Sequence, residues 1–444
     1  MPRALPLGFQ PNILVINSDD APLNWYAGMP LWTSNWASSF LDFRANGSCN
    51  TPLCLPGRAA TLTGLRIEQH RGWDNGSGAN LNLAQTFLVA CQRAGYRTGA
   101  VGKWINGFGE GGASGFGTQT RQPGLSWQRI MWGAPDYFDY DILDETGALT
   151  HYGLPASEGG SDANYATDVE RANVLSFIGS ADPRPWCLYW APKAPHKDGG
   201  GAGGPTPAPR HAATPITLVQ SPSFGLSPAA YGNPPWLIES AETPWNSTTI
   251  DAVTAEHVEA MRTLLALDEA IHDVFTALQA AGKLASTAVF VKTDNAHAYG
   301  EMRQTDKGTP HRSASSMLLQ VRIPGIAGGT RSHAVSDIDI APTVCELAGA
   351  VMPRSPDGMS MLRACQSPSG AHRKAAPMGS PIKDSPTFRA YWDDTGRVVH
   401  QGLPGGKGSG QVGSWADVDH TTNVPPTAAQ LASLALLSLP VPTV

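Results

Sequence analysis

Three short polar clusters each stand directly behind an apolar stretch of strand length. Asp19 and Asp20 come after "NILVIN", His196 comes after "LYWAPKAP", and Asp294 with Asn295 comes after "AVFVKT". One such cluster by itself is usually a solvated turn. Open α/β sheets, however, bind their ligands beyond the carboxyl ends of their parallel strands. The three clusters together therefore predict one polar site at a single sheet edge.

Asp19, Asp20 and Asp294 carry carboxylates and Asn295 carries an amide. These four side chains form a ligand set suited to a hard cation. Neighbouring carboxylates repel one another and raise each other's pKa unless a cation lies among them. Oxygen ligands favour Ca²⁺ or Mg²⁺ over zinc. We therefore expect Asp19, Asp20, Asp294 and Asn295 to hold one divalent cation.

A cysteine occupies an informative place in the stretch "CNTPLCLPGRAATLTG", residues 49–64. Cys54 stands where a loop gives way to a predicted helix that begins near Gly57. A buried apolar thiol, or one half of a disulfide, is the commonest role for a cysteine. The other interpretation is a nucleophile or the precursor of one, and this stretch alone leaves both open.

The hydrophobic pattern supplies the frame for these residues, because predicted strands alternate with predicted helices. The predicted strands lie at 12–17, which is a continuous apolar run, and at 96–103, 185–192, 287–294 and 317–325. The helices lie at 81–95, 167–178, 254–282 and 336–350, besides the one near Gly57. This alternation predicts an α/β fold with a large, mostly parallel sheet sandwiched by helices.

Two segments break the alternation. Residues 199–250 are rich in Gly, Pro, Ser and Thr and are predicted to form long loops. From about residue 366 the pattern fades, and it ends in an apolar helix candidate at 427–439. We therefore expect a main α/β domain over 1–365 and a small C-terminal α+β subdomain over 366–444.

The totals exclude several classes of protein. A net charge of −6 without long charged runs gives no indication of a basic surface that would bind nucleic acid or an anionic membrane. No apolar run approaches the roughly 20 residues that span a bilayer. The six cysteines contain no C-x-x-C pair, which argues against a structural zinc site.

The sequence leaves the cellular location open. The stretch "MPRALPLGFQ" contains no visible signal peptide, so either the chain is cytoplasmic or a leader is missing from this sequence. Three N-x-S/T sequons, at Asn46, Asn75 and Asn246, are compatible with secretion.

Ordered blocks of the sequence resemble the type I sulfatases of the alkaline-phosphatase superfamily. "CLPGRAATLTG" is similar to that family's C-x-P-x-R motif, and "PNILVINSDD" to its first metal-binding strand. The blocks that follow in the family's order are "GYRTGAVGKW", "APKAPH", "KTDNAHAYGE", "DKGTPH" and "VSDIDIAPTVCELAG". The resemblance covers about residues 11–365 and looks strongest to the N-acetylglucosamine-6-sulfatase and heparan sulfatase branch. It implies secretion, or a periplasmic or lysosomal location.

In that family the cysteine is oxidised to formylglycine, and the resemblance places this residue at Cys54. A hydrated aldehyde carries one hydroxyl that attacks the sulfate sulfur and a second that later expels sulfate. The resemblance implies that Arg58 holds this diol, while Lys103 and Lys307 neutralise sulfate oxygens. It also implies that His196 protonates the leaving alcohol.

The resemblance further implies a divalent metal, with Ca²⁺ preferred to Mg²⁺. Its implied ligands are Asp19, Asp20, Cys54 in its oxidised form, Asp294 and Asn295. The metal would polarise a sulfate oxygen and lower the pKa of the attacking hydroxyl, whose proton Asp294 would take. The implied partners are a sulfated carbohydrate or other sulfate ester and, during maturation, a formylglycine-generating enzyme.

Several positions depart from the family's pattern. Ile105 stands where the family often has a histidine, and Ala296 and Ala298 replace a glycine and a histidine. We expect His297 and His311 to be solvated and without contact to substrate. These departures leave the nucleophile and the metal ligands in place. They weaken the inference that this chain acts on the same substrate as the resembling branch.

The function predicted is hydrolysis of a sulfate ester, on a sulfated sugar or a related compound. A phosphonate monoester or phosphodiester hydrolase shares the fold and also binds a tetrahedral anion, so relative rates on the two esters must separate these activities. A catalytically inactive protein that binds sulfated glycans is the third alternative. The intact Cys54, Arg58, Lys103, His196 and Lys307 argue against it.

Overall fold

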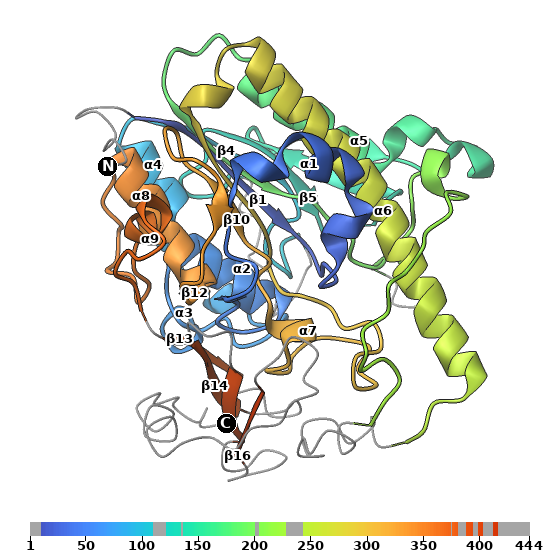
Figure 1. Cartoon of the computed structure of the whole chain (residues 1–444). Coiled ribbons are helices and arrows are strands. Elements are labelled where there is room, and N and C mark those ends of the chain that lie inside the picture. Colours follow the sequence, from blue (N-terminus) through green and yellow to red (C-terminus); the bar gives the residue numbers. More distant parts are fainter. Residues whose placement is uncertain are drawn as a thin grey trace.

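The computed structural model describes residues 10–109, 121–134, 136–199, 204–227, 243–373, 375–380, 388–393, 398–402 and 412–415. In these ranges a ten-stranded sheet lies between two layers of helices, and a four-stranded antiparallel sheet follows it in sequence (Figure 1). The predicted α/β class is therefore confirmed. The helix predicted at 427–439 lies outside the described residues.

The middle of the large sheet consists of parallel neighbours. Its strands run in the order β11-β2-β10-β9-β1-β8-β4-β5-β6-β7. The parallel strands are β9 (Thr287–Thr293), β1 (Asn12–Ser18), β8 (Trp186–Ala191), β4 (Arg97–Gly102) and β5 (Trp127–Trp132). Towards the edges lie β10 (Gln320–Arg322), β2 (Leu41–Asp42), β11 (Gly329–Thr330), β6 (Tyr140–Asp144) and β7 (Leu149–Tyr152). A separate parallel pair joins β3 (Gly47–Ser48) to β12 (Val335–Ser336).

The central strands β1, β8 and β9 are mostly apolar because both faces of the sheet are covered. In β1, Ile13 and Val15 belong to one hydrophobic cluster, whereas Leu14 and Ile16 belong to the other. Alternate side chains of a strand point to opposite faces. The polar residues that follow β1, β8 and β9 are thereby fixed to the end of a rigid, fully buried layer.

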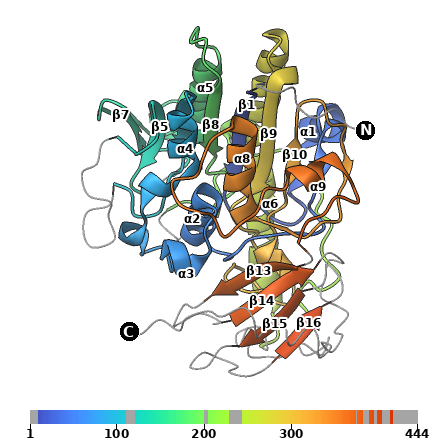
Figure 2. The same ribbon diagram turned by 90° about the vertical axis from the view of Figure 1, so that its left-hand side faces the viewer.

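Helices cover each face of the sheet (Figures 1 and 2). One layer holds α2 (Cys54–Thr63), α4 (Phe87–Arg93), α8 (Ile340–Ala348) and α9 (Leu362–Gln366). The other layer holds α1 (Pro30–Asn35), α5 (Ala166–Ile178) and the long α6 (Ser247–Ala280). Two short helices, α3 (Ile67–His70) and α7 (Arg312–Ser315), complete the set. Among the described residues, no helix combines the length and apolar character that crossing a bilayer requires.

The structure corrects several predicted boundaries. The helix predicted near Gly57 begins at Cys54, after Leu53 in an extended conformation. Gly57 lies inside this helix, where a Cβ atom would come 2.6 Å from the carbonyl oxygen of Asp294, so the helix packs closely on the end of β9. The helix predicted at 254–282 begins earlier, at Ser247, because Asn246 caps it by accepting a hydrogen bond from the Thr249 amide at 2.9 Å.

Two other predictions were wrong in extent. The helix predicted over 81–95 contains only α4 and a preceding 3₁₀ turn, and the strand predicted over 317–325 contains only β10. Strands β5, β6 and β7 were missed.

The second sheet is an antiparallel meander of β13 (Ala375–Ser380), β14 (Phe388–Asp393), β15 (Val398–Gly402) and β16 (Val412–Trp415). It lies against the loop that leads to Cys54 (Figure 2). Asn50 Nδ2 donates to the Pro377 carbonyl at 3.1 Å, and Thr51 Oγ1 donates to the Gly379 carbonyl at 2.8 Å. The domain boundary expected at residue 365 falls within α9 and stays a prediction.

Candidate active site

The polar residues predicted to meet at the sheet edge do meet there. Isolated bridges pair Asp19 with Pro195 and Ala21 with Ala296, so the chain segments after β1, β8 and β9 stay in register beyond the strands. Asp20 has a φ of 59°, in the left-handed region. Its amide donates to Asp294 Oδ1 at 3.3 Å, which ties the segment after β1 to the segment after β9.

Cys54 lies at the N-terminus of the ten-residue helix α2 and is buried. Its Sγ lies 2.9 Å from Lys307 Nζ and 3.9 Å from Asp20 Oδ1. Burial raises the pKa of the thiol to about 12, although the neighbouring Lys103 and Lys307 act against this shift. The thiolate is the reactive form of cysteine, so unmodified Cys54 is a poor nucleophile near neutral pH.

Three cations face the carboxylates around Cys54. Arg58 donates from Nε to Asp294 Oδ2 at 2.9 Å and from Nη1 to the Lys103 carbonyl at 2.9 Å. The Lys103 ammonium donates to Asp19 Oδ2, and Lys307 Nζ donates to Asp20 Oδ1 at 2.5 Å. Burial alone would raise the pKa of both aspartates, but the lysines outweigh it and hold both carboxyls ionised.

Asp294 differs from these two aspartates. Its Oδ1 accepts hydrogen bonds from the Asp20 and Asn295 amides, and its Oδ2 accepts from Arg58. Burial, together with the charge of Asp19, raises its pKa to about 7 in spite of Arg58. A carboxyl that titrates near neutrality can exchange a proton under physiological conditions.

His196 faces the same cluster from the segment that follows β8. Its Nε2 lies 3.4 Å from Asp20 Oδ2, and its Nδ1 lies 2.6 Å from the Lys197 carbonyl oxygen. A carbonyl only accepts, so Nδ1 carries the proton of the neutral ring. Burial lowers the imidazole pKa to about 3, so the ring is neutral near pH 7 in this state.

The residues at this edge fit a hard cation. Asp19, Asp20, Cys54 and His196 each offer one ligand atom, and these atoms lie within 4.8 Å of one another. Asp19 Oδ1 and Asn295 Oδ1 are buried and accept no hydrogen bond from the described residues. Buried oxygen acceptors without donors are what a hard cation requires. Relative to the predicted ligand set, the geometry places His196 beside the ligand atoms and turns the Asp294 carboxylate towards Arg58.

His297 and His311 correct an expectation, because neither is solvated. Their exposed fractions are 3% and 0%. His297 Nδ1 lies 3.6 Å from Asp20 Oδ2, since the pairing of Ala21 with Ala296 draws this segment against the first metal motif. The position of His297 two residues after Asn295 was the signal that could have found it.

A buried pair behind the His196 loop was also missed. Glu170 on α5 accepts from Trp190 Nε1 at 3.2 Å and from the Lys193 amide at 3.3 Å. Lys193 Nζ donates to the Lys197 carbonyl at 2.6 Å, within the loop that carries His196. Burial raises the pKa of Glu170 to about 8 and lowers that of Lys193 to about 8. Glu170 gave no sequence signal, because it stands in an ordinary amphipathic helix.

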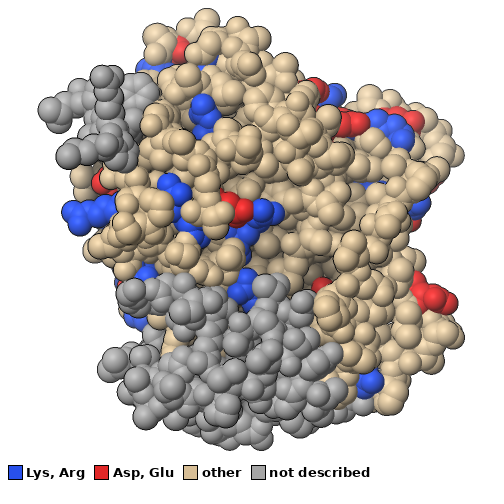
Figure 3. Space-filling view, viewed as in Figure 1, with Lys and Arg blue, Asp and Glu red and all other residues tan. Residues whose placement is uncertain are grey.

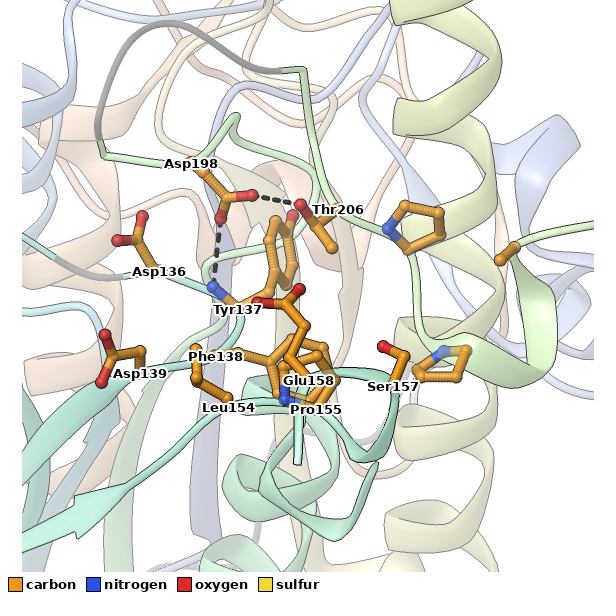
Figure 4. A pocket seen from close by; sticks show the side chains of 13 residues that line it. Asp136, Tyr137, Phe138, Asp139, Leu154, Pro155, Ser157, Glu158, Asp198 and Thr206 are labelled. Atoms are coloured by element: carbon orange, nitrogen blue, oxygen red, sulfur yellow. Dashed lines mark hydrogen bonds between the residues drawn. The ribbon is translucent and has the colours of Figure 1, made fainter. Parts of the chain in front are cut away.

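A hollow of about 630 Å³ lies on the other side of the His196 loop (Figure 4). Its wall includes four acidic residues, Asp136, Asp139, Glu158 and Asp198. The Asp198 carboxylate accepts from the Tyr137 amide at 3.1 Å and from the Thr206 hydroxyl (Figure 4). This acidic hollow repels anions, so it is distinct from the cationic pocket around Cys54.

Solved structures show the fold independently of this geometry. A protein in complex with its substrate D-glucosamine-2-N,6-O-disulfate superposes with a TM-score of 0.72 at 21% identity, covering 96% of each chain. The phosphonate monoester hydrolase of Agrobacterium radiobacter gives 0.68 at 17% identity, covering 96% of this chain and 94% of that one. The fold is thus common to both chemistries and does not separate them.

Sequence relatives carry the comparison further. N-acetylglucosamine-6-sulfatase of Capra hircus is 27% identical over 323 residues, which are 70% of this chain but 55% of that protein. N-acetylglucosamine-6-O-sulfatase of Bacteroides thetaiotaomicron is 24% identical, over 79% of this chain and 70% of that one. The chain thus spans about half the length of its mammalian relatives. The sulfatase family model matches residues 11–350. Because this match takes in most of the chain and every residue around Cys54, the chain belongs to the sulfatase family.

Proposed function

We propose that this protein hydrolyses sulfate esters of sugars, with formylglycine made from Cys54 and one divalent cation. The observation that supports this most strongly is the setting of Cys54. A buried cysteine begins a ten-residue helix, with Lys307 at 2.9 Å and Asp20 at 3.9 Å. Its raised thiol pKa leaves little thiolate for attack, so a chemical conversion of the side chain agrees with the site better than a cysteine nucleophile.

The pocket supports recognition of a tetrahedral anion. The N-terminal amides of α2 and the ammonium groups of Lys103 and Lys307 all meet at Cys54. Arg58 is held by Asp294 and by the Lys103 carbonyl, so its guanidinium is fixed before substrate arrives. A bound cation among Asp19, Asp20 and Asn295 would supply charge that polarises a sulfate oxygen. Lys307, next to Cys54, would neutralise another sulfate oxygen.

We assign the proton transfers to two side chains. Formylglycine supplies, as its hydrate, one hydroxyl that attacks sulfur and a second that releases sulfate as the aldehyde re-forms. Asp294, whose pKa is about 7, accepts the proton of the attacking hydroxyl. His196 donates a proton from Nε2 to the leaving alcohol, and the negative charge of the bound ester raises its pKa towards the value this requires.

We propose Ca²⁺ rather than Mg²⁺ as the cation. Ca²⁺ accepts about six to eight oxygen ligands in flexible geometry, and the buried oxygens that lack donors, on Asp19 and Asn295, come from two separate segments. Mg²⁺ demands near-ideal octahedral geometry at about 2.1 Å, which ligands from separate segments meet less readily.

The proposal is tested by weighing the peptide that carries Cys54 after co-expression with a formylglycine-generating enzyme. We expect the mass of an aldehyde in place of the thiol, and release of sulfate from N-acetylglucosamine 6-sulfate at a higher rate than cleavage of a phosphonate monoester. Cys54→Ala abolishes activity, whereas Cys365→Ala, another buried cysteine in α9, retains it. An unmodified thiol, in a host that converts a control sulfatase, contradicts the proposal.

A further inference from the structure

A second cavity of about 290 Å³ opens beside the metal-binding segments, and we call it the outer cleft. Its wall comes from the loop after β1, from the segment 219–224, from α6 and from the chain after Asn295. The residues that matter here are Asn24, Val219, Phe224, His257, Tyr299 and Glu301.

A column of three aromatic rings joins the outer cleft to the pocket around Cys54. His297, 3.6 Å from Asp20 Oδ2, packs on Tyr299 with ring centroids 4.6 Å apart. Tyr299 in turn stacks on His257 at 4.6 Å, with 13° between the planes. His257 Nε2 lies 3.1 Å from Asn24 Oδ1, on the loop that begins at Asp20. The cleft therefore lies next to the site, and its wall is built on the segments that carry Asp20 and Asn295.

The wall is also fixed before any ligand binds. Phe224 and Glu301 form a backbone bridge, and the Gly225 amide donates to the Gly300 carbonyl at 2.8 Å. Gly300 has a φ of 111°, and a Cβ atom there would come 2.4 Å from the Phe224 ring. The glycine thus lets Phe224 lie directly against the chain after Asn295, which presents an aromatic face to the cleft.

The outer cleft differs from the inner pocket in charge. Among the described residues that line it, Glu301 is the only one with a formal charge, because burial lowers the pKa of His257 to about 4. From residue 211 to residue 261 the sequence contains no Lys or Arg. Arg303 follows Glu301 closely, but it is outside the lining and donates from Nε to the Gly225 carbonyl at 2.9 Å.

The surface agrees with this charge pattern. In Figure 3 the lower right of the face, where the N-terminal half of α6 runs, is mostly uncharged. The hollow beyond the His196 loop is lined by four acidic residues and offers no cation in its described lining. An anionic group on the leaving alcohol would lose hydration in either cavity without gaining a positive partner.

We propose that the outer cleft receives the leaving alcohol and selects alcohols without a second negative charge. This inference rests on the proposed function. The ligand class is a sulfate monoester of an uncharged, partly apolar alcohol, such as a neutral sugar whose apolar face packs on Phe224. The Asn24 amide and the hydroxyl-bearing segment 219–224 would form hydrogen bonds with its hydroxyl groups. A mostly apolar wall with a few polar groups is the usual make-up of small-molecule sites.

The first test compares two substrates that share the 6-sulfate and differ in a second charge. With the converted, metal-loaded enzyme, we expect kcat/KM for N-acetylglucosamine 6-sulfate to exceed that for glucosamine 2-N,6-O-disulfate by about tenfold or more, which is about 1.4 kcal/mol. Equal rates, or a preference for the disulfate, overturn the inference. 4-Nitrophenyl sulfate serves as the reference, because inactivity on all three esters overturns the proposed function instead.

A variant pair tests the same cleft without disturbing the catalytic pocket. Val219 and Val351 are 81% and 83% exposed, and Val351 follows α8 on the opposite face of the sheet. We expect V219K to raise the disulfate-to-monosulfate ratio of kcat/KM about two- to fivefold at low salt, the range of one exposed charge pair. V351K leaves the ratio unchanged, and added salt removes the effect of V219K. An equal change in both variants, or none in V219K, contradicts the assignment.

Discussion

The pocket around Cys54 and the outer cleft lie at opposite ends of one column of rings, yet they differ sharply in charge. The pocket sets Arg58, Lys103 and Lys307 against three aspartates, whereas Glu301 is the only formally charged residue among the described residues that line the cleft. Of these two regions, only the pocket presents cationic side chains in the described part of the chain. The rest of a substrate must be chosen by shape, stacking and neutral hydrogen bonds.

The two regions also differ in how the fold builds them. The pocket stands on the ends of buried parallel strands and on the first turn of α2, which fix side chains accurately. The cleft takes much of its wall from the segment 219–224, within the long loops that precede α6. Loops on a rigid scaffold vary more readily than the scaffold itself. Related chains can therefore keep the pocket and change the leaving group.

The largest effect is expected at Asp20, on which the pocket depends. Asp20→Asn removes the charge that faces Lys307 and the proposed cation, while asparagine tolerates the left-handed φ of 59° at this position. We expect the fold to persist and activity to fall at least about 10³-fold, because the metal contributes several kcal/mol to catalysis. Rates are measured on N-acetylglucosamine 6-sulfate, and metal content by elemental analysis.

Asp182→Asn is the control for this change, because this half-buried carboxylate pairs locally with Arg184 in the loop before β8. Asp182→Asn should leave the rate and the metal content at the level of the chain without substitutions. If Asp20→Asn keeps full metal content and activity, the proposed ligand set is wrong.

The contrast between the two regions explains how much the sequence could predict. The stretches "NILVIN" and "AVFVKT" are mostly apolar, and the residues that follow them, Asp19, Asp294 and Asn295, are predicted at one edge from this pattern alone. The α/β class is confirmed, and the structure brings these residues together with Cys54 and Lys307 at one sheet edge, while the roles assigned to them stay predictions. A strong local pattern was enough where residues follow buried strands directly.

The cleft could not be predicted, because it depends on pairings between distant segments. His297 was expected to be solvated, but its burial follows from the bridge between Ala21 and Ala296, and only its position two residues after Asn295 hinted at this. The contact of Phe224 with Gly300 joins a loop to the chain after β9, and neither stretch carries a signal for the other. Strands β5 to β7 were also missed; β6 and β7 pair antiparallel towards the edge of the sheet, where β7 is largely exposed.

A second, smaller effect separates the leaving-group side of the pocket from the sulfate side. His196→Gln removes the proposed acid, and we expect kcat on N-acetylglucosamine 6-sulfate to fall about 10²-fold, the lower part of the range for a positioned acid. A nitrophenolate leaves without protonation, so the loss on 4-nitrophenyl sulfate should be less than about tenfold. Equal losses on both esters would mean that His196 binds sulfate or metal and does not protonate the alcohol.

Glu170 provides a test of stability behind the His196 loop. Its pKa is raised from 4.5 to about 8 by burial, so the folded state binds this proton more tightly than the unfolded state. The resulting stabilisation is complete below about pH 4.5 and is lost as the pH rises through 8. A glutamine at position 170 cannot ionise. The Tm of Glu170→Gln should therefore decline less between pH 6 and 9 than the Tm of the chain without the substitution. Parallel Tm curves for the two proteins would show that Glu170 ionises normally.

The smallest effect concerns the contact between the second sheet and the loop before Cys54. Thr51→Val keeps the shape of the buried side chain but removes its 2.8 Å hydrogen bond to the Gly379 carbonyl. We expect the free energy of unfolding to fall by about 1 kcal/mol, the usual net value of one such bond. Activity should change less than about twofold, because the two bonds between Asn50 and the second sheet remain.

Denaturant unfolding and kcat, measured on the same samples, decide what the second sheet does for the pocket. The exposed Thr330→Val on β11 serves as the control for the threonine-to-valine change. A loss of activity in Thr51→Val without a loss of stability would mean that the second sheet positions the N-terminus of α2, and with it Cys54. The charged pocket would then depend on two units of the fold, whereas the outer cleft depends on the large sheet and its loops.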